Sequence, residues 1–295
     1  MNRAEVSDFL SSRRARITPE QAGLPTWAEN RRVPGLRREE VALLAGVSVD
    51  YYVHLERGNL AGVSEQVLEA VASALQLDEA ERSHLADLAR AASTKGPRTA
   101  ARPRVRPPVQ WLLDAMDSSA AYVRNARTDL LAANRLGRAL YAPVYDQPGR
   151  PNVARFVFLD PRAPEFFVEW DKVAAEAAAL LRTLAGENPY DHGLTELVGE
   201  LSTRSEVFRQ LWARHDVRLH RTGTKRFHHP VVGELTLAYE GLDVAADSGL
   251  RLNAYIAEPG TPSAEAFSLL ASWASTPQAH DHPTTAAANK PEGIR

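Results

Sequence analysis

Within residues 31–58, two short stretches with apolar residues at helical spacing lie on either side of Gly46-Val47-Ser48. The apolar positions are Val41, Ala42 and Ala45 in the first stretch and Tyr52 and Leu55 in the second. Gly46 can adopt a positive φ without a Cβ clash, which lets the backbone reverse sharply. Ala42 falls where the two helices would cross, and a longer side chain there would push them apart. The pattern predicts a helix-turn-helix.

The second of these helices is expected to leave a mixed polar surface facing outward. The outward residues are Ser48, Val49, Asp50, Tyr51 and His54. Their hydroxyl, methyl, carboxylate, phenol and imidazole groups suit the base edges of a DNA major groove. An ordinary pair of antiparallel helices without a nucleic-acid role has the same spacing, so spacing alone leaves both interpretations open.

A resemblance to known regulators favours the DNA-binding interpretation. Residues 36–58, through the closing Leu55-Glu56-Arg57-Gly58, resemble the Cro/repressor (XRE) class of helix-turn-helix. The preceding string, VPGLRREEVA from Val33 to Ala42, resembles a narrower group, the MmyB-like transcriptional regulators. The resemblance implies binding to specific sequences of double-stranded DNA. One departure is Arg37, where many such helices begin with Ser or Thr, so a side-chain N-cap is missing.

Four arginines leading into the first helix of the motif are candidate phosphate ligands: Arg31, Arg32, Arg37 and Arg38. Backbone N–H groups at a helix N-terminus also favour an anion. Because the net charge of the chain is -2, DNA binding depends on where the arginines point rather than on their excess. A solvated charged loop is the alternative interpretation.

Length and composition limit the remaining possibilities. A chain of 295 residues exceeds the usual size of one domain, so two are expected. The 44% apolar and 24% charged shares are typical of a soluble globular protein. We find no apolar run that approaches the ~20 residues needed to cross a membrane and no secretory signal, which predicts a cytoplasmic location. The chain contains no cysteine, which excludes disulfides, thiol chemistry and Cys-based metal sites.

The predicted domain boundaries follow from caps and composition. Residues 1–92 should form a bundle of five helices, in which Ser64 caps the fourth and Asp78 and Glu81 form a capping box before the fifth. Residues 93–108, rich in Pro and Arg, are expected to be a basic linker, with a supplementary role along the DNA backbone as the alternative. A second domain should occupy 109–275, and the Pro- and Ala-rich 276–295 should be a disordered tail.

Strand and helix patterns alternate in the second domain. A helix over 109–116 is expected to precede a hairpin of strands 121–125 and 129–134, after which Asn134 caps the next helix. A long helical face follows, formed by Phe167, Trp170, Ala174, Ala177, Leu181 and Leu184. Later elements are helices over 194–201 and 206–213, strands over 217–220, 234–239 and 250–257, and a last helix carrying Ala266, Leu269, Leu270 and Trp273. These patterns predict an α+β domain with an antiparallel sheet.

Residues 108–275 also resemble the C-terminal domain of the MmyB-like group. The strings that carry this resemblance are Val198-Gly199-Glu200-Leu201-Ser202, Phe208-Arg209, Leu211-Trp212-Ala213, His215-Asp216-Val217, His229-Pro230-Val231-Val232-Gly233 and Ala257-Glu258-Pro259-Gly260. The resemblance implies a PAS-like fold that holds a fatty-acid-like ligand.

An amphiphilic ligand would need apolar walls and a few polar groups at the mouth of its cavity. The candidate wall residues are Phe158, Phe167, Trp170, Phe208, Trp212 and Tyr239, for which plain core packing is the alternative. Arg155 and Arg182 are candidate partners for a carboxylate, since a guanidinium donates two parallel hydrogen bonds. Surface ion pairs are the alternative for both arginines.

Catalytic and metal-binding functions find no support in the sequence. His215, His220, His228 and His229 lack the spacing of a zinc site. Asp216 beside His215 is not accompanied by a recognisable nucleophile motif, and there is no glycine-rich phosphate loop. We therefore expect no enzymatic activity, no metal and no cofactor apart from a fatty-acid-like ligand.

Together these patterns predict a transcription regulator that binds DNA as a homodimer and senses a small amphiphilic effector, without a membrane partner. The alternative is a regulator whose second domain is a ligand-free module for dimerisation or protein interaction. In the first case, binding of the effector would shift the population of DNA-binding arrangements, a coupling typically worth about 1–3 kcal/mol.

Overall fold

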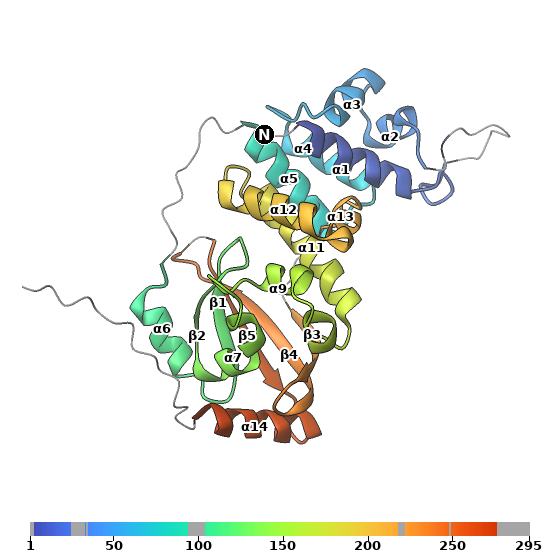
Figure 1. The fold of residues 1–295 in the computed structure, drawn as a ribbon. Coiled ribbons are helices and arrows are strands. Elements are labelled where there is room, and N and C mark those ends of the chain that lie inside the picture. The colour runs from blue at the N-terminus through green and yellow to red at the C-terminus, as the bar shows by residue number, and fades with distance from the viewer. Residues whose placement is uncertain are drawn as a thin grey trace, which may run out of the picture.

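The computed structural model describes residues 3–24, 33, 35–93, 104–217, 222–247 and 249–275. An N-terminal bundle of helices is followed by a domain in which helices surround an antiparallel sheet (Figure 1). This confirms the predicted order of an all-α helix-turn-helix domain and an α+β domain. Within the described residues, no helix combines the length and the apolar content that crossing a membrane requires.

The N-terminal bundle is organised around the predicted helix-turn-helix. Its helices are α1 (Arg3–Arg16), α2 (Arg38–Ala45), α3 (Val49–Glu56), α4 (Glu65–Ala74) and α5 (Glu79–Ser93). The apolar positions of α2 and α3 are buried in its core, as their spacing predicts. Gly46 ends α2 in the left-handed conformation, with φ +64°, which is the turn geometry that a side chain would strain.

Side-chain caps fix where these helices begin. The hydroxyl of Ser48 accepts the backbone N–H of Tyr51 at 3.1 Å at the start of α3, and Ser64 caps α4 in the same way. The predicted capping box before α5 is present, because Asp78 and Glu81 each accept the other's backbone N–H. The start of α2 lacks a side-chain cap from Arg37, as expected, but the carboxylate of Glu40 accepts the Arg37 backbone N–H at 2.6 Å.

The second domain begins with α6 (Pro107–Asp114), followed by β1 (Ala120–Arg124) and β2 (Leu130–Ala133). The helices that follow are α7 (Arg135–Leu140), α8 (Ala142–Tyr145), α9 (Val153–Leu159), α10 (Ala163–Phe166), α11 (Trp170–Glu187), α12 (His192–Arg204) and α13 (Glu206–Trp212). The chain then forms β3 (Thr222–His229), β4 (Gly233–Asp243), β5 (Arg251–Ala257) and α14 (Pro262–Ser275). The sheet order is β2-β1-β5-β4-β3, with every neighbouring pair antiparallel.

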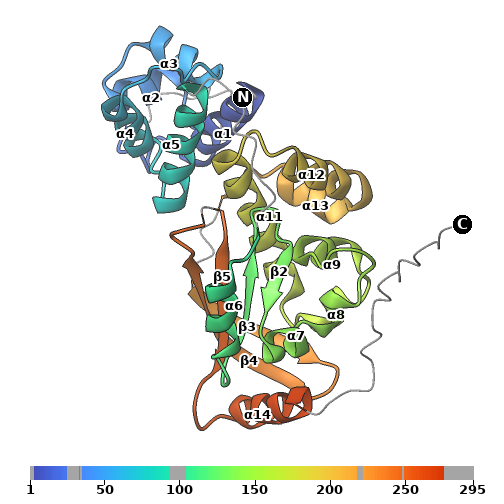
Figure 2. The ribbon, with the colours of Figure 1, turned by 90° about the vertical axis from the view of Figure 1, so that its left-hand side faces the viewer.

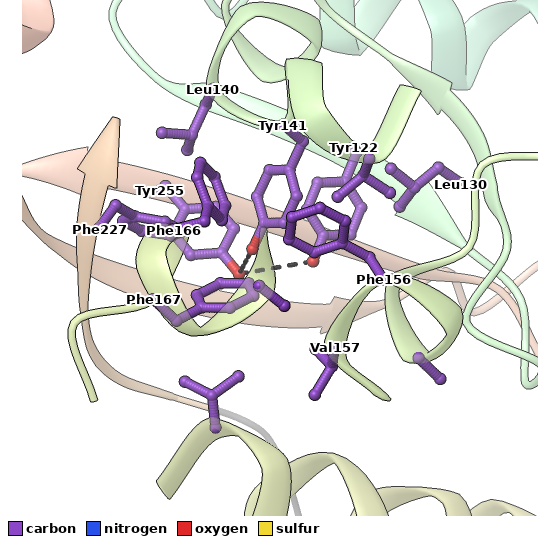
Figure 3. Close-up of a cluster of buried hydrophobic side chains, with 14 of the residues drawn as sticks. Tyr122, Leu130, Leu140, Tyr141, Phe156, Val157, Phe166, Phe167, Phe227 and Tyr255 are labelled. Carbon is purple, nitrogen blue, oxygen red and sulfur yellow. Dashed lines mark hydrogen bonds between the residues drawn. The ribbon is translucent and has the colours of Figure 1, made fainter. Parts of the chain in front are cut away.

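One face of the sheet carries an aromatic core beneath α7 to α11 (Figures 2 and 3). Tyr255 lies at its centre, where its hydroxyl accepts a hydrogen bond from Tyr141 at 2.7 Å and lies 3.4 Å from the hydroxyl of Tyr122. Burial raises the pKa of Tyr141 and of Tyr255 well above the usual value. On the opposite face, α6 packs Val109 and Leu113 against β1 and β5.

Several element predictions differ from the structure. Thr18 and Gln21 form the reciprocal hydrogen bonds of a capping box, but these close a turn rather than start a helix. Gly23 follows at once with φ +71°, which ends the helical conformation. α6 begins at Pro107, inside the predicted linker, because proline is well suited to the first position of a helix. Phe167 precedes α11 instead of lying on it, and forms a β-bridge with Phe227.

The structure places the first of the late strands farther along the chain than the sequence predicts. Val217 lies outside any strand, and 218–220 lie outside the described residues, whereas β3 covers Thr222–His229. Its inward positions include Lys225 and His229, whose polar side chains hide the usual apolar alternation. The remaining segments of the predicted linker, 94–103, and of the predicted tail, 276–295, lie outside the described residues.

Candidate functional site

Helix α3 presents an exposed ridge at the end of the molecule farthest from the sheet (Figures 1 and 2). All five predicted outward residues, Ser48, Val49, Asp50, Tyr51 and His54, are exposed. Tyr51 is 38% exposed, whereas the adjacent Tyr52 is fully buried. The helix therefore separates an anchoring face from a free polar face, which is the geometry required of a helix that enters a major groove.

A buried carboxylate fixes the direction of this helix. Glu56, at the end of α3, is 1% exposed and accepts hydrogen bonds from Arg14 of α1 at 2.9 Å and from Arg38 of α2 at 2.6 Å. Arg14 also donates to the carbonyl of Leu36 at 2.8 Å. Since charged hydrogen bonds are strong and directional, this cluster ties α3 to the two helices beside it.

The structure describes two of the four predicted phosphate ligands, Arg37 and Arg38. Arg31 and Arg32 lie outside the described residues. Arg37 lies at the start of α2, where its guanidinium is 3.4 Å from Glu39. Arg38 is bound to Glu56 through Nε, yet its side chain is 54% exposed at the N-terminal end of α2. Both arginines therefore lie where an incoming phosphate would also meet the free N–H groups of a helix N-terminus.

The two domains meet along a seam formed by α1 and α5 on one side and α11 and residues 212–217 on the other. Arg182 of α11 is buried there, where it donates to the Trp212 carbonyl at 2.6 Å. Its guanidinium lies 4.0 Å from the centre of the Trp212 ring and 3.9 Å from Glu5. Burial lowers the pKa of Arg182 to about 10, an effect that Glu5 opposes.

The closest approach in the seam is between Gly186 of α11 and His84 of α5. A Cβ added to Gly186 would lie 2.6 Å from two atoms of the His84 ring, so only glycine permits this packing. His84 is fully buried and meets Phe9 edge-on, with ring centres 5.0 Å apart. Neither ring nitrogen of His84 has a hydrogen-bond partner within the described residues. Burial accordingly lowers the pKa of His84 to about 3.

A second set of contacts extends the seam beyond α13. Arg13 of α1 donates to the carbonyl of His215 and lies 2.9 Å from Glu81, and Arg16 pairs with Asp216. Val217 packs in the apolar core of the N-terminal bundle rather than in that of the second domain. The chain after α13 therefore crosses into the other domain and fastens the two together.

Cavities of different size adjoin α11. One of ≈ 600 Å³ lies between Lys172 and Ala179 of α11 and the start of α5. Another of ≈ 440 Å³ lies in the seam, where its charged groups include the mutually facing Arg182 and Glu5. A small one of ≈ 40 Å³, the inner cavity, lies inside the second domain between α9, α11 and the sheet. This inner cavity is lined by Tyr122, Arg124, Thr128, Val153, Ala154, Val157, Val173, Glu176, Ala177, Leu180, Lys225 and Asn253.

None of the eight predicted ligand residues lines the inner cavity. Arg155 pairs with Glu200 at 2.8 Å on the surface, and Arg182 and Trp212 lie in the seam. The others pack in the core: Phe158 with Phe208, Phe167 with Phe227, Tyr239 with Tyr255, and Trp170 through a 3.0 Å hydrogen bond to the Val157 carbonyl. Arg124, Lys225 and Asn253 line the inner cavity instead, and the only sequence signal for them is a polar residue at an inward strand position.

The histidines after α13 have separate surroundings. His228 and His229 face opposite sides of β3, as their alternation predicts. The buried His229 lies with Nε2 3.0 Å from the Ala139 carbonyl, while its Nδ1 accepts the Val231 backbone N–H at 3.2 Å. These partners give His229 a structural role. Within the described ranges, no group of three or more His, Asp or Glu side chains is arranged to hold a metal ion.

A helix-turn-helix with an exposed second helix, joined to an α+β domain, is the architecture of a DNA-binding transcription regulator. Comparison with models of protein families supports this class of protein. Residues 5–85 match the model of a helix-turn-helix domain, and residues 105–270 match that of the MmyB-like transcription regulator ligand binding domain. Because the second match spans more than half of the chain, the protein belongs to the MmyB-like transcription regulators. A search of curated proteins finds no match to the chain.

The low pKa of His84 predicts how stability depends on pH. The unfolded chain takes up a proton at this side chain as the pH falls through 6.5, whereas the native protein does so only near pH 3. Stability should therefore fall between these values, by up to about 1.4 kcal/mol per pH unit. Replacing His84 by leucine should reduce this slope in urea unfolding measured by circular dichroism.

The exposed His228 provides the matched control for this measurement. H228L should keep the wild-type slope, because its ring does not lie in the seam. His215, whose pKa burial lowers to about 4, should leave a residual slope in H84L. An unchanged slope in H84L would show that His84 takes up protons in the native protein.

Proposed function

We propose that this protein controls transcription in the cytoplasm by inserting α3 into the major groove of an operator. The exposed ridge of α3, opposite its buried face, is the observation that carries this proposal. Ser48, Val49, Asp50, Tyr51 and His54 would contact base edges. Arg31, Arg32, Arg37 and Arg38 would contact phosphates, which position the protein without distinguishing sequences.

A homodimer is part of this proposal. One helix of two turns contacts only a few base pairs, whereas two copies on a two-fold site double the contacts and square the discrimination. The second domain would support this self-association. The two half-sites of the operator would be separated by about one turn of DNA or a multiple of it.

The second domain would bind a small amphiphile of the fatty-acid type within a PAS-like fold. Helix α11 would couple the ligand site to DNA binding, because one face of the helix lines the inner cavity and another face meets the N-terminal bundle. Val173, Ala177 and Leu180 line the inner cavity, whereas Arg182 and Gly186 meet the N-terminal bundle. A ligand that displaces α11 would therefore change how the DNA-binding helices are held, which is the population shift that regulation requires.

The alternative is a second domain that only supports dimerisation, and the dense aromatic core and small inner cavity favour it. Mass spectrometry under native conditions separates the two. A small molecule that co-purifies and remains bound to the folded chain supports sensing. If the protein has the mass of the polypeptide alone, and if this mass does not change when sodium dodecanoate is added, the dimerisation module is supported.

The proposed roles on the DNA-binding surface predict two kinds of mutational effect. After selection of an operator from random duplexes, Y51A and H54A should each weaken operator binding by about 1–3 kcal/mol with little effect on random DNA. R37A should weaken binding to both and reduce the salt slope by about one. Fluorescence anisotropy over a range of salt concentrations measures both quantities.

E69A, on the exposed surface of α4, is the matched control and should bind as wild type does. Arg38 is less suitable than Arg37 for the phosphate test, since R38A also releases Glu56 and so disturbs α3. Equal losses on operator and random DNA for Y51A, H54A and R37A would contradict the division into base and phosphate contacts.

The seam supplies a test of coupling. G186A should drive α11 away from His84 and loosen the seam, so hydrogen exchange should rise in α5 and α11 but not in α3. In wild type, saturating dodecanoate should change operator affinity several-fold, and in G186A this change should fall below about twofold. G199A is the control, because a Cβ at Gly199 in α12 meets no atom within 4 Å. If G186A retained full coupling, transmission through the seam would be ruled out.

A further inference from the structure

The cavity in the seam between the two domains, ≈ 440 Å³, has the size of a small-molecule site. Pockets that bind such molecules typically measure about 300–1,000 Å³, and they often lie where domains meet. Both domains contribute to its wall: α1 and α5 of the N-terminal bundle, and α11, α12 and residues 212–215 of the second domain (Figures 1 and 2). A molecule held here would therefore contact both domains at once.

Charged groups of both signs lie together in this cavity. Glu5 and Asp8 belong to α1, and Arg182 belongs to α11. Nη1 of Arg182 lies 3.9 Å from Oε1 of Glu5, which is too far for a hydrogen bond. Asp8 lies 4.0 Å from Nε2 of His215. The guanidinium and the carboxylates thus face one another across a gap that they do not close.

Neither Arg182 nor Glu5 is fully compensated by the charge of the other. Their side chains are 4% and 23% exposed. Burial lowers the pKa of Arg182 in spite of Glu5, and burial raises the pKa of Glu5 in spite of Arg182. Both shifts favour the neutral form, so the cost of burial exceeds the attraction between the two groups. Each would gain from a further group of opposite charge.

Buried polar atoms without partners gather around the same cavity. Nδ1 of His215, which lines it, has no hydrogen-bond partner within the described residues, and the same is true of both ring nitrogens of His84. His84 lies directly behind Gly186 of the cavity wall. Such atoms are rare in native proteins. Their presence here indicates that the chain alone does not satisfy the polar side of the seam.

The remaining wall of the cavity is mainly aliphatic. Leu88 and Ala91 come from α5, Ala185 from α11, and Leu194 and Val198 from α12. A short hydrocarbon group placed against them would be removed from water, which favours binding. The wall therefore suits a small ligand that carries both charges at one end and an aliphatic group at the other.

We propose that the seam cavity binds a free α-amino acid with an aliphatic side chain. The carboxylate of the amino acid would accept hydrogen bonds from Arg182, and its ammonium would lie between Glu5 and Asp8. Its side chain would lie against Leu194 and Val198. A carboxylate alone would be repelled by Glu5, and an amine alone by Arg182. This site is separate from the inner cavity and does not depend on amphiphile sensing.

Such a ligand would join the two domains. It would connect α1 of the N-terminal bundle to α11 and α12 of the second domain, at the place where the chain leaves polar groups unsatisfied. A ligand that binds only the closed seam stabilises it. Hydrogen exchange should therefore slow in α1, α5 and α11 when the amino acid is added, and stay unchanged in α14.

Isothermal titration calorimetry of the full chain tests the site with L-leucine and two analogues. 4-Methylpentanoate lacks the ammonium of leucine, and 3-methylbutylamine lacks its carboxylate. Wild type should bind leucine with a dissociation constant below about 1 mM. It should bind each analogue at least about tenfold more weakly, because each loses one charge-assisted contact.

Two variants locate the ammonium contact. E5Q should bind leucine no more tightly than 4-methylpentanoate, and D8N, whose side chain is 58% exposed, should reduce the preference several-fold. A merely structural role of either carboxylate would weaken both ligands in proportion and leave the preference unchanged. E196Q is the matched control, because Glu196 is exposed on α12 and does not line this cavity. It should bind leucine as wild type does.

Several results would overturn the proposal. Failure of wild type to bind leucine would do so, as would equal binding of leucine and either analogue. If E5Q and D8N both kept the full preference for leucine, the amino acid would bind elsewhere. The comparison of ligands in wild type is decisive even if E5Q fails to fold. None of these results bears on amphiphile sensing, which dodecanoate tests separately.

Discussion

The close packing of α11 against both domains is the constraint on which the arrangement of the molecule depends. One face of this helix covers the aromatic side of the sheet, and another meets α1 and α5 of the N-terminal bundle. The second contact requires a small residue at position 186, where any side chain would collide with His84. Since packed interiors shift between discrete arrangements rather than deforming continuously, a displacement of α11 cannot leave the seam unchanged.

Two buried charged side chains, Glu56 and Arg182, hold neighbouring helices in a fixed orientation. Glu56 joins α1, α2 and α3 through two arginines, and Arg182 joins α11 to the C-terminal end of α13 and to α1. Buried ion pairs contribute little net stability compared with apolar packing, but removing one partner is strongly destabilising. Their value here is geometric, because each permits a single relative placement of the helices it connects.

The inward polar residues of the sheet differ from these pairs. Asn253 and Arg124 retain buried atoms without partners in the described chain, next to a densely packed aromatic cluster (Figure 3). A core selected only for stability would place apolar side chains at these positions. Proteins accept such a cost where function requires it.

Local sequence determined the helix-turn-helix almost completely. The spacing of Tyr52 and Leu55, the positive φ of Gly46 and the Ser48 cap are short-range features, so the pattern predicts both the elements and the exposed face of α3. The base-contacting roles of Tyr51 and His54 remain predictions. In the second domain, the hairpin of β1 and β2 and the cap at Asn134 also depend on neighbouring residues alone, and the structure confirms both predictions.

Only the tertiary structure decided which side chains meet across the second domain. Arg124, Lys225 and Asn253 come from three strands that are distant in the sequence, and the sheet order brings them to one cavity. Arg155 and Arg182 adjoin aromatic segments in the sequence, but one lies on the surface and the other faces the N-terminal bundle. Periodicity states whether a residue points inward or outward, and long-range packing alone determines what it faces.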